Sequence, residues 1–323
     1  MKEDGTMAKY VLKRLLQTVF TVLLVVTIVF LLMRLLPTDY YFTEDQLIKL
    51  TEEQKHDILL ADGMLDHPLE QLYRFFRDLF TKGDLGDSRR IMAGQPVTKV
   101  IGTKFTVSMR LGLIALGISL VIGVVLGVIQ ARFKDGLMDN LGTAYTVFVN
   151  AVPTLVTYSL ILAFGSRVLG LPSMYNVRKV QLSSILPIAC LAVGSIAGYM
   201  LWTRRYMVDE LNKDYIRLAR LKGMSTRAVM FRHVLKNAFV PLAQYLPASI
   251  LLTVGGSLLV ERFFSVPGMG PLLTDSITRY DLNVVQGVVI LYASLGTLGV
   301  FLGDLLMSII DPRIRLTDKG ASR

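Results

Sequence analysis

Few side chains of this sequence are suited to catalysis or to metal binding. The single cysteine, Cys190, lies within an uncharged apolar run, so the chain has neither an internal disulfide nor a redox pair. Of the three histidines, His56 and His67 fall in one polar stretch and His233 in another, and we expect a membrane to separate the two stretches. A metal site that uses all three histidines is therefore disfavoured.

Sequence motifs for nucleotide and hydrolase chemistry are absent as well. The chain has no G-x-x-x-x-G-K-[ST] sequence, so it does not supply its own P-loop for a nucleotide. It also lacks the H-E-x-x-H motif of zinc proteases and the G-x-S-x-G nucleophile elbow. We therefore predict a non-catalytic chain with no catalytic residue, cofactor or metal of its own.

One acidic residue, Asp304, lies late in an apolar run. A charge at the centre of a membrane helix costs about 2.5–3.5 kcal/mol, so even a peripheral carboxylate needs a reason. Asp304 could bind a proton or cation in an ion-coupled carrier, or it could pair with a basic residue such as Arg313. Carriers of that kind need several polar groups near the bilayer midplane, and only one is visible, so we favour the ion pair.

The composition is that of a membrane protein. Of the 323 residues 52% are hydrophobic, and the mean hydropathy is +0.51. Six uncharged runs of 19 to 26 residues are each long enough for one helical crossing of a bilayer. They are 15–33, 111–131, 141–166, 180–203, 237–260 and 282–303. The predicted fold is an all-α integral membrane protein with six transmembrane helices.

The positions of the basic residues set the expected orientation. The formal net charge is +10, and much of the excess lies in short loops and termini beside the apolar runs, as the positive-inside rule requires. We therefore expect contact with membrane lipid and no nucleic-acid partner. The expected order is a cytoplasmic N-terminus (1–14), a first transmembrane helix (15–36), an external segment (37–104), a core of helices 2 to 6 (105–310) with a cytoplasmic loop (204–237), and a cytoplasmic C-terminus (311–323).

The segment 204–241, between the fourth and fifth runs, is strongly basic. It holds nine Lys or Arg and three acidic residues, which agrees with a cytoplasmic location. Its first part carries apolar residues at helical spacing, which predicts one helix with a single apolar stripe. The stripe is Met207, Leu211, Tyr215 and Leu218.

Turn and capping residues divide the same segment. Gly223 is expected to end the first helix in the left-handed conformation that glycine favours. Ser225 is a candidate cap for a second helix that continues through Lys236, and Pro241 lies near the start of the next span. A helix–turn–helix that continues into two membrane spans would act as a lever.

The external segment is predicted to form short helices. Two capping boxes begin at Thr43 and Thr51, each with glutamine three residues later. Pro68 is expected to begin a third helix that Gly83 ends. With about 68 residues, this segment is too small to fold independently, so we expect it to pack on the external mouth; a disordered loop is the alternative.

Small residues and prolines mark helix contacts within the runs. The second run has a small residue at every fourth position, which predicts close approach to another helix; these residues are Ala115, Ser119, Gly123, Gly127 and Ala131. The sixth run has a shorter stripe at Gly296, Gly299 and Gly303. Kinks are expected at the intraspan prolines Pro153, Pro187 and Pro247.

Several stretches together resemble the B-type permease subunit of oligopeptide and dipeptide ABC importers, over nearly the whole chain. The segment 214–223 (DYIRLARLKG), followed by 232–238 (RHVLKNA) and Pro241, is similar to the coupling loop of that family. Further agreement lies in 83–88 (GDLGDS), 96–98 (PVT), 151–154 (AVPT), 261–270 (ERFFSVPGMG) and 311–315 (DPRIR). The match is weaker around 38–66.

The resemblance implies the type I importer permease fold and a set of partners. These are a second, homologous permease subunit, two ATP-binding subunits that hold ATP and Mg²⁺, and an extracytoplasmic substrate-binding protein. It also implies a coupling helix around 218–224, the turn 267–268 at the outer side, and an outer gate formed by 271–280. Nickel complexes, opines or glutathione are alternative cargoes within the same class.

Docking on the ATP-binding subunit would then involve one set of residues in this loop. Ala219 is expected to permit close contact, Gly223 to allow the turn, and the cations to meet acidic groups or simply to set the orientation. The full set is Asp214, Tyr215, Arg217, Leu218, Ala219, Arg220, Lys222, Gly223 and Met224. The sequence does not identify the residues that line a substrate pathway.

Overall fold

The computed structural model describes residues 3–310, and almost all of its regular structure is helical. In the described part of the chain the only sheet is one antiparallel pair of two-residue strands, β1 (Asp87–Ser88) and β2 (Gln95–Pro96). The long helices are α1 (Glu3–Met33), α5 (Val97–Arg132), α6 (Leu137–Ala151), α7 (Thr154–Arg167), α8 (Val180–Leu211), α11 (Lys236–Val254) and α14 (Leu282–Ile310).

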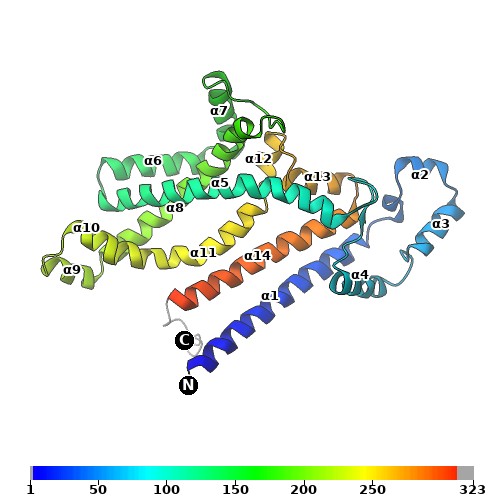
Figure 1. Cartoon of the computed structure of the whole chain (residues 1–323), viewed down its shortest axis with the longest axis horizontal. Coiled ribbons are helices and arrows are strands. Elements are labelled where there is room, and N and C mark those ends of the chain that lie inside the picture. The colour runs from blue at the N-terminus through cyan, green and yellow to red at the C-terminus, as the bar shows by residue number, and fades with distance from the viewer. Residues whose placement is uncertain (1–2, 311–323) are drawn as a thin grey trace.

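The shorter elements lie at the two ends of this body. On one end are the 3₁₀ turn Thr38–Tyr41, α2 (Glu44–Lys49), α3 (Glu52–Ala61) and α4 (Pro68–Lys82). At the opposite end are α9 (Asp214–Leu221), α10 (Thr226–Val229) and a π-helical turn, Met230–Leu235. Two more short helices, α12 (Leu258–Phe263) and α13 (Met269–Thr278), precede α14 (Figure 1).

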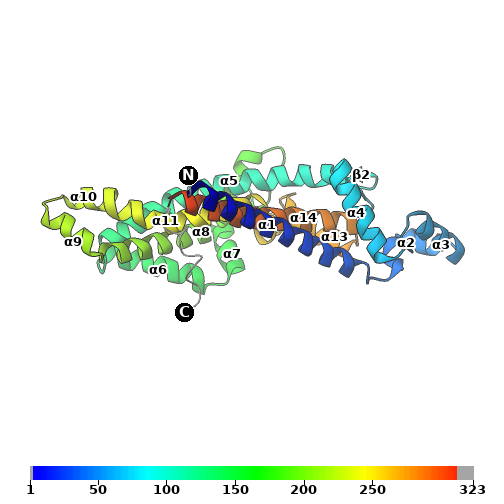
Figure 2. The ribbon, with the colours of Figure 1, turned by 90° about the horizontal axis from the view of Figure 1, so that it is seen from below.

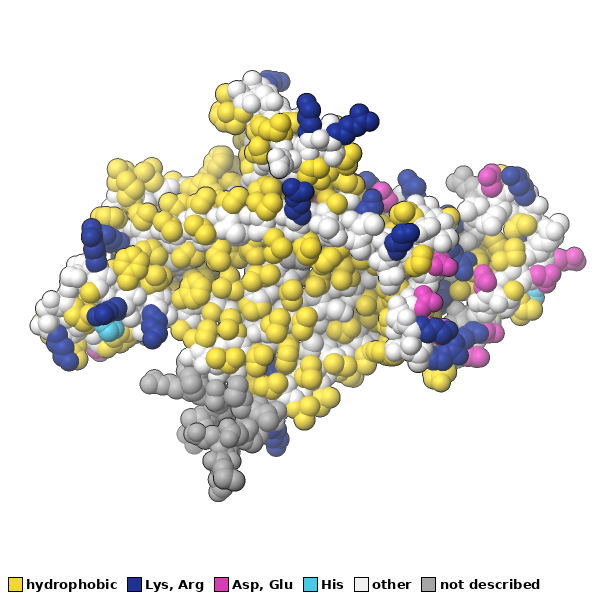
Figure 3. Space-filling model, viewed as in Figure 1, with side chains coloured by type: hydrophobic (Ala, Val, Ile, Leu, Met, Phe, Trp, Pro, Cys, Tyr) yellow, Lys and Arg dark blue, Asp and Glu magenta, His cyan; other side chains and the backbone are white. Residues whose placement is uncertain are grey.

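The predicted membrane fold is confirmed. Five helical segments are long and apolar enough to cross a bilayer, and a bent pair raises the number to as many as six. The five are Lys9–Met33, α5, α8, Thr226–Phe263 and α14. Figure 3 shows the hydrophobic side chains spread over the middle of the molecule, with many of the basic ones toward its ends, as a bilayer requires.

The third apolar run does not form the single straight crossing that its length predicts. Instead the helix direction bends by 111° between α6 and α7, at residues 152–153. Val152 is extended (φ −80°, ψ 130°), because the ring of Pro153 clashes with a helical conformation of the residue before it. Proline also lacks the N–H that would continue the helix. By contrast, α8 continues through Pro187 and α11 through Pro247.

The fifth run also differs from its prediction. The helix that begins at Thr226 does not end at Lys236 but continues through the π turn into α11, so Pro241 lies inside a helix. This helical segment then breaks at residues 255–257, where Gly256 has a φ of +96°, and restarts as α12. Ser257 caps α12 by accepting a hydrogen bond from the N–H of Val260.

The spans pack through the predicted small residues. Helix α5 lies along α8, α11 along α14, and α14 along α1 (Figure 1). A Cβ at Gly127 would lie 2.7 Å from the carbonyl oxygen of Met200, and one at Gly299 would lie 2.6 Å from the Cα of Ala248. Only glycine permits these approaches, and all five small residues predicted on the second run are buried.

The short helices of the predicted external segment (37–104) form as expected, but α5 already begins at Val97, so the segment before it is 37–96. Thr43 and Thr51 each complete a capping box with Gln46 and Gln54. Helix α4 begins at Pro68 and ends before Gly83, whose φ of +65° is the left-handed conformation. Figure 2 shows α2 and α3 beyond the ends of α1 and α5, so this segment adds to one end of the body.

Candidate functional site

The basic elbow, residues 204–237, connects the fourth and fifth membrane segments. Its first part is not the single helix that the apolar stripe predicts, because α8 ends at Leu211 and α9 begins at Asp214. Lys213, between them, is extended (φ −74°, ψ 144°) and acts as the N-cap of α9 without a side-chain hydrogen bond. The acidic side chain of Asp214 in the first turn favours a helix N-terminus there.

Helix α9 has a buried face and an exposed face. Ile216 (0% exposed) and Ala219 (7%) point into the protein. Their neighbours come from the end of α5, from α8 and from the start of the Thr226–Phe263 segment. One apolar cluster therefore joins α9 to these three membrane segments. The other buried members of this cluster, here called the elbow core, are Ala131, Met207, Val229, Met230, Val234 and Ala238.

The exposed face of α9 combines apolar and basic side chains. Leu221 is 84% exposed and Leu218 52% exposed, although both are leucines in an ordered helix. Arg217 forms a solvent-exposed ion pair with Asp214 at 3.3 Å. In the described part of the chain, neither Arg220 nor Lys222 forms an ion pair. An exposed apolar tip with free cations beside it is typical of an interaction surface.

Most predicted docking residues lie on this exposed face, but two do not. The exposed ones are Asp214, Tyr215, Arg217, Leu218, Arg220, Lys222 and Gly223. Ala219 faces the elbow core, and Met224 is half-buried against it, so neither can make the close outward contact expected of Ala219. The helix itself spans 214–221 rather than 218–224. Leu221, the most exposed of the large apolar residues in the described part of the chain, was missed because nothing in the apolar spacing distinguishes it.

The turn after α9 forms as predicted. Gly223 has a φ of +79°, and Ser225 accepts a hydrogen bond from the N–H of Ala228 to cap α10. A Cβ added at Gly223 would meet no atom within 4 Å. The turn therefore requires glycine for its backbone conformation and not for space.

Polar contacts hold α9 to the helices on either side. The Tyr215 hydroxyl donates a hydrogen bond to the Glu210 carboxylate and accepts one from Nδ2 of Asn237 at 2.6 Å. Partial burial, together with the hydrogen bond to Glu210, raises the pKa of Tyr215. Tyr215 thus joins the end of α8, the start of α9 and the start of α11.

A buried ion pair stands at the base of the elbow. Arg204 on α8 donates from Nε and Nη2 to the two carboxylate oxygens of Asp139 on α6, the second at 2.7 Å. Asp139 also accepts from the backbone N–H of Asp135 at 2.9 Å, and its side chain is 3% exposed. This pair ties the α8 end of the elbow to the loop between α5 and α6.

A second set of polar contacts lies at the end of the molecule opposite the elbow. Asp281, fully buried before α14, accepts hydrogen bonds through Oδ2 from the Ser88 hydroxyl at 2.7 Å and from three consecutive backbone N–H groups, 89–91. Burial alone would raise the pKa of Asp281, but these bonds outweigh it and hold the pKa below its ordinary value. Sequence reasoning missed this carboxylate, although an acidic residue directly before an apolar run is a signal for a helix start.

The turn at 267–268 is followed directly by an ordered helix. The N–H of Gly268 donates to the carbonyl of Val266 at 2.8 Å, and α13 follows at once. Glu261, 2% exposed, accepts from the N–H of Gly270 at 2.7 Å and from that of Ser257 at 3.3 Å. It therefore holds together the break before α12 and the turn before α13, another role that the sequence did not reveal.

The described residues contain no group of three or more His, Cys, Asp or Glu arranged to hold a metal ion. His67 caps α4 by accepting a hydrogen bond from the N–H of Leu69 at 3.3 Å, and His233 lies in the π turn next to Tyr215.

Comparison with known proteins places this geometry in a family. Residues 123–316 match the family described as binding-protein-dependent transport system inner membrane component, and this range contains the elbow. The chain belongs to this family. It is 34% identical to the dipeptide transport system permease protein DppB of Lactococcus lactis subsp. cremoris over 317 residues, 96% of this chain and 100% of that protein.

Other relatives of the permease are also peptide transport components. The dipeptide transport system permease protein DppB of Bacillus subtilis is 32% identical over 97% of this chain and 100% of its own length. The oligopeptide transport system permease protein AmiC of Streptococcus pneumoniae is 37% identical over 65% of this chain and 42% of its own. The predicted resemblance to oligopeptide and dipeptide permeases is confirmed.

The acidic residue in the last span of the permease has a partner. Asp304 pairs with Arg14 of α1 at 3.3 Å. Asp304 therefore forms an ion pair, as expected, but its basic partner comes from the first helix. Arg313, the partner suggested by the sequence, lies outside the described residues, as does the whole predicted C-terminal segment 311–323. The contact explains how α14 tolerates a carboxylate.

Proposed function

We propose that this permease is the membrane subunit of an ATP-driven peptide importer and that the basic elbow is where an ATP-binding subunit docks. The observation that carries the proposal is the construction of α9. Its outer face presents Leu218 and Leu221 among cations, while Ile216 on its inner face is buried in the elbow core. A partner that moves α9 would therefore move the ends of α5, α8 and the Thr226–Phe263 segment with it.

The orientation follows from the same assignment. With the elbow in the cytoplasm, the N-terminus and the 311–323 segment are cytoplasmic, and the 37–96 segment faces outward. That segment then receives a substrate-binding protein, and a second, homologous permease subunit completes the passage. ATP and Mg²⁺ belong to two partner subunits, and the permease contributes no catalytic group. The family name, which specifies binding-protein-dependent transport, supports a partner of this kind.

Peptides are the cargo that the relatives support best, because their printed names specify dipeptide or oligopeptide transport. Nickel complexes, opines and glutathione stay open within the same class, since a binding protein selects the cargo. An ion-coupled carrier is disfavoured, because its one candidate residue, Asp304, is already neutralised by Arg14.

Charge substitution on the exposed face tests the docking proposal. Leu221→Asp should abolish copurification of the ATP-binding subunits with the permease and should abolish ATP-dependent peptide uptake, because the carboxylate would be buried in an apolar contact. Ile48→Asp is the matched control for copurification, since Ile48 is 83% exposed on α2 at the opposite end. Retention of the ATP-binding subunits and of uptake by Leu221→Asp would overturn the proposal.

A further inference from the structure

Two cavities follow one face of α8 through the membrane-spanning body. The first, of about 360 Å³, lies between α8 and α11. The second, of about 370 Å³, lies between α8, the bent pair α6–α7 and the start of α12. Ser195 lines both of them, so the two cavities form one continuous surface, here called the α8 groove.

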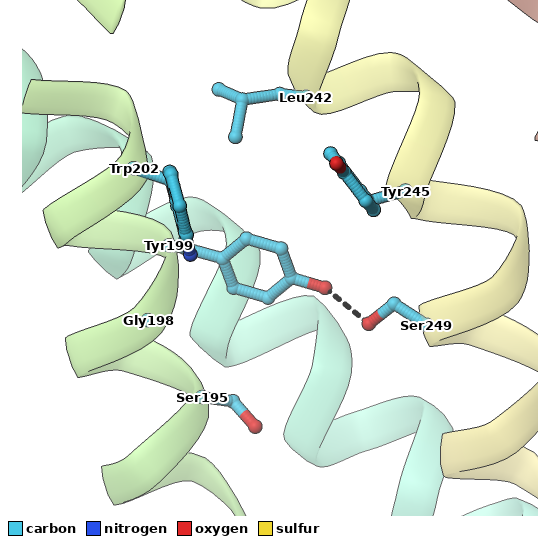
Figure 4. Close-up of a pocket in the computed structure, with 7 residues that line it drawn as sticks. All are labelled: Ser195, Gly198, Tyr199, Trp202, Leu242, Tyr245 and Ser249. Atoms are coloured by element: carbon cyan, nitrogen blue, oxygen red, sulfur yellow. Dashed lines mark hydrogen bonds between the residues drawn. The ribbon is translucent and has the colours of Figure 1, made fainter. Parts of the chain in front are cut away.

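The α8 groove is lined by hydroxyl, amide and aromatic side chains, together with aliphatic ones such as Leu242 and Leu191, and by no charged one. In the first cavity Tyr199 of α8 projects toward α11, and its hydroxyl lies 2.6 Å from Oγ of Ser249 (Figure 4). Trp202 and Tyr245, from the two helices, supply further rings and are 43% and 63% exposed. These groups can hydrogen-bond and stack without selecting a charge.

The helix breaks at residues 152–153 and 255–257 both face the second cavity. Thr154, the first residue of α7, and Ser257, the N-cap of α12, belong to its lining. The N-cap of α7 is Pro153, which has no side-chain acceptor, so the first N–H groups of α7 have no side-chain partner. Broken helices deep in a membrane are tolerated where they line a cavity, and their free N–H groups attract carbonyl or carboxylate oxygens.

Thr157, on the first turn of α7, adds an independent sign of a ligand. The residue is only 7% exposed and lines the second cavity, and its Oγ1 has no hydrogen-bond partner among the described residues. A buried hydroxyl left unpaired costs about 1–3 kcal/mol, so a partner that enters the cavity is expected. Asn150, at the end of α6, supplies amide donors and an acceptor nearby.

Glycines leave room for a chain along the same face. Gly194 lines the second cavity and Gly198 the first, one helical turn apart. A Cβ at either position would meet no atom within 4 Å, in contrast to Gly123 and Gly127, which are closed by contact with α8. These two glycines therefore do not serve packing within this chain, and they widen the groove.

We propose that the α8 groove is the wall along which the main chain of a peptide passes. The hydroxyls, the Asn150 amide and the free N–H groups of α7 match the alternating carbonyls and N–H groups of a peptide backbone. The absence of charge lets side chains of either sign pass, and the aromatic rings accommodate apolar ones. This inference rests on the proposed peptide transport and adds the surface that carries it out.

Other occupants fit the groove less well. A metal or inorganic ion would need charged or convergent ligands, and none lines either cavity. A lipid chain would leave the hydroxyls and the N-terminus of α7 without partners, at a cost in free energy. A helix of the second permease subunit is the remaining occupant, and it would make the groove dry.

Water access separates a passage from a dry or lipid-covered surface. In a Cys190→Ala background, Gly198→Cys in the assembled transporter should react with a water-soluble methanethiosulfonate reagent during ATP turnover. Gly117→Cys on α5 is the matched control, since Gly117 is also free of contacts within 4 Å but faces away from the groove, where lipid would cover it. We expect full labelling at 198 and none at 117; equal resistance at both positions would overturn the proposal.

Blocking the groove provides the functional arm. Gly198→Trp should abolish ATP-dependent uptake of radiolabelled trialanine in proteoliposomes, whereas Gly117→Trp should transport as the wild type does. Uptake by Gly198→Trp at the wild-type rate would overturn the groove assignment while leaving peptide import intact. Failure of the wild-type assembly to import trialanine or any dipeptide would instead count against the proposed function, and the labelling result would stand apart from it.

Discussion

The two ends of the permease are held to the membrane spans by different combinations of contacts. At the basic elbow, one apolar core joins α9 to α5, α8 and the Thr226–Phe263 segment, with Ile216 fully buried at its centre. At the opposite end, the 37–96 segment combines apolar contacts, such as Leu85 and Ile91 against α5, α13 and α14, with a set of long-range hydrogen bonds. Asp281 accepts four of them, and Arg90 donates to the carbonyl oxygens of Tyr40 and Phe42.

This difference suits two different tasks. Close-packed apolar contacts transmit displacement, because any gap among them costs contact energy throughout the cluster. The 37–96 segment also packs on the spans, but its links through Asp281 and Arg90 are individual hydrogen bonds, which can open while the spans keep their own packing. We therefore infer that the elbow moves with the spans and that the 37–96 segment moves on them.

The largest loss of stability is expected when the buried ion pair between Arg204 and Asp139, at the base of the elbow, is broken. Arg204→Ala leaves the carboxylate of Asp139 buried without its partner, and breaking such a pair costs about 3–5 kcal/mol. We expect a large drop in the thermal unfolding midpoint of the detergent-solubilised permease, measured by intrinsic fluorescence. Arg217→Ala is the control, because its ion pair is solvent-exposed and should contribute almost nothing.

The double substitution Arg204→Met with Asp139→Leu refines this prediction. Replacement of a buried pair by apolar residues is often neutral, so the double variant should recover most of the lost stability. If the double variant were as unstable as Arg204→Ala, the pair would owe its effect to the shape of its hydrogen bonds rather than to its charges. The elbow would then depend on polar geometry, as the opposite end does.

The next effect tests the apolar core directly. Ile216→Ala should destabilise the permease by about 2–5 kcal/mol, because it leaves a cavity between α9 and the spans. Leu221→Ala, at a residue that is 84% exposed, should leave the unfolding midpoint unchanged. Equal midpoints for the two variants would show that α9 is not packed on the spans, and the comparison between the two ends would fail.

A smaller effect is expected from the polar attachment of the 37–96 segment. Asp281→Ala removes the acceptor of four hydrogen bonds, but the released Ser88 hydroxyl and backbone N–H groups can bond to water, so the loss should stay local to this end. Hydrogen exchange of the amides at 89–91 should accelerate, while exchange in the elbow should not. Asp57→Ala, at an exposed position on α3, is the control.

The same carboxylate gives a pH dependence. Because the folded pKa of Asp281 lies below its ordinary value of about 3.9, its charge stabilises the fold at all higher pH values. That contribution is lost as the pH falls through the folded pKa. The amides at 89–91 should therefore stay protected from hydrogen exchange at neutral pH and lose this protection only in acid. Loss of protection near pH 6 would contradict this assignment.

Sequence reasoning reached most of the fold because local signals dominate in membrane helices. Uncharged runs gave the spans, threonine and glycine gave the ends of the short helices, and Gly223 and Ser225 gave the turn of the elbow. The bend at Pro153 was anticipated as a kink, but its angle of 111° depends on how α7 packs against α8. Such packing has no local sequence signature.

The candidate site was predicted less completely, for the same reason. Exposed and buried positions on α9 depend on where the helix starts, and the break at residues 212–213 rotated Ala219 inward and Leu221 outward. The pairs Arg204–Asp139 and Arg14–Asp304 join residues 65 and 290 positions apart in sequence, which charge patterns alone do not match. The α8 groove likewise arises only when separate helices meet.

The smallest effect on stability is expected at the turn of the elbow, where the effect on transport should still be large. Gly223→Ala forces a residue with a Cβ into a φ of +79°, which costs about 1–2 kcal/mol, but the added methyl meets no neighbour. Gly170→Ala is the matched control, because Gly170 has a φ of +64° and equally open surroundings in a loop far from α9.

Both variants should unfold at nearly the same temperature. Only Gly223→Ala should lower peptide uptake per ATP hydrolysed, since it alone tilts α9 relative to its core, and Gly223→Asn should lie between that variant and the wild type because asparagine tolerates the left-handed conformation. If both alanine variants lowered the ratio equally, stability rather than the angle of the elbow would set the coupling.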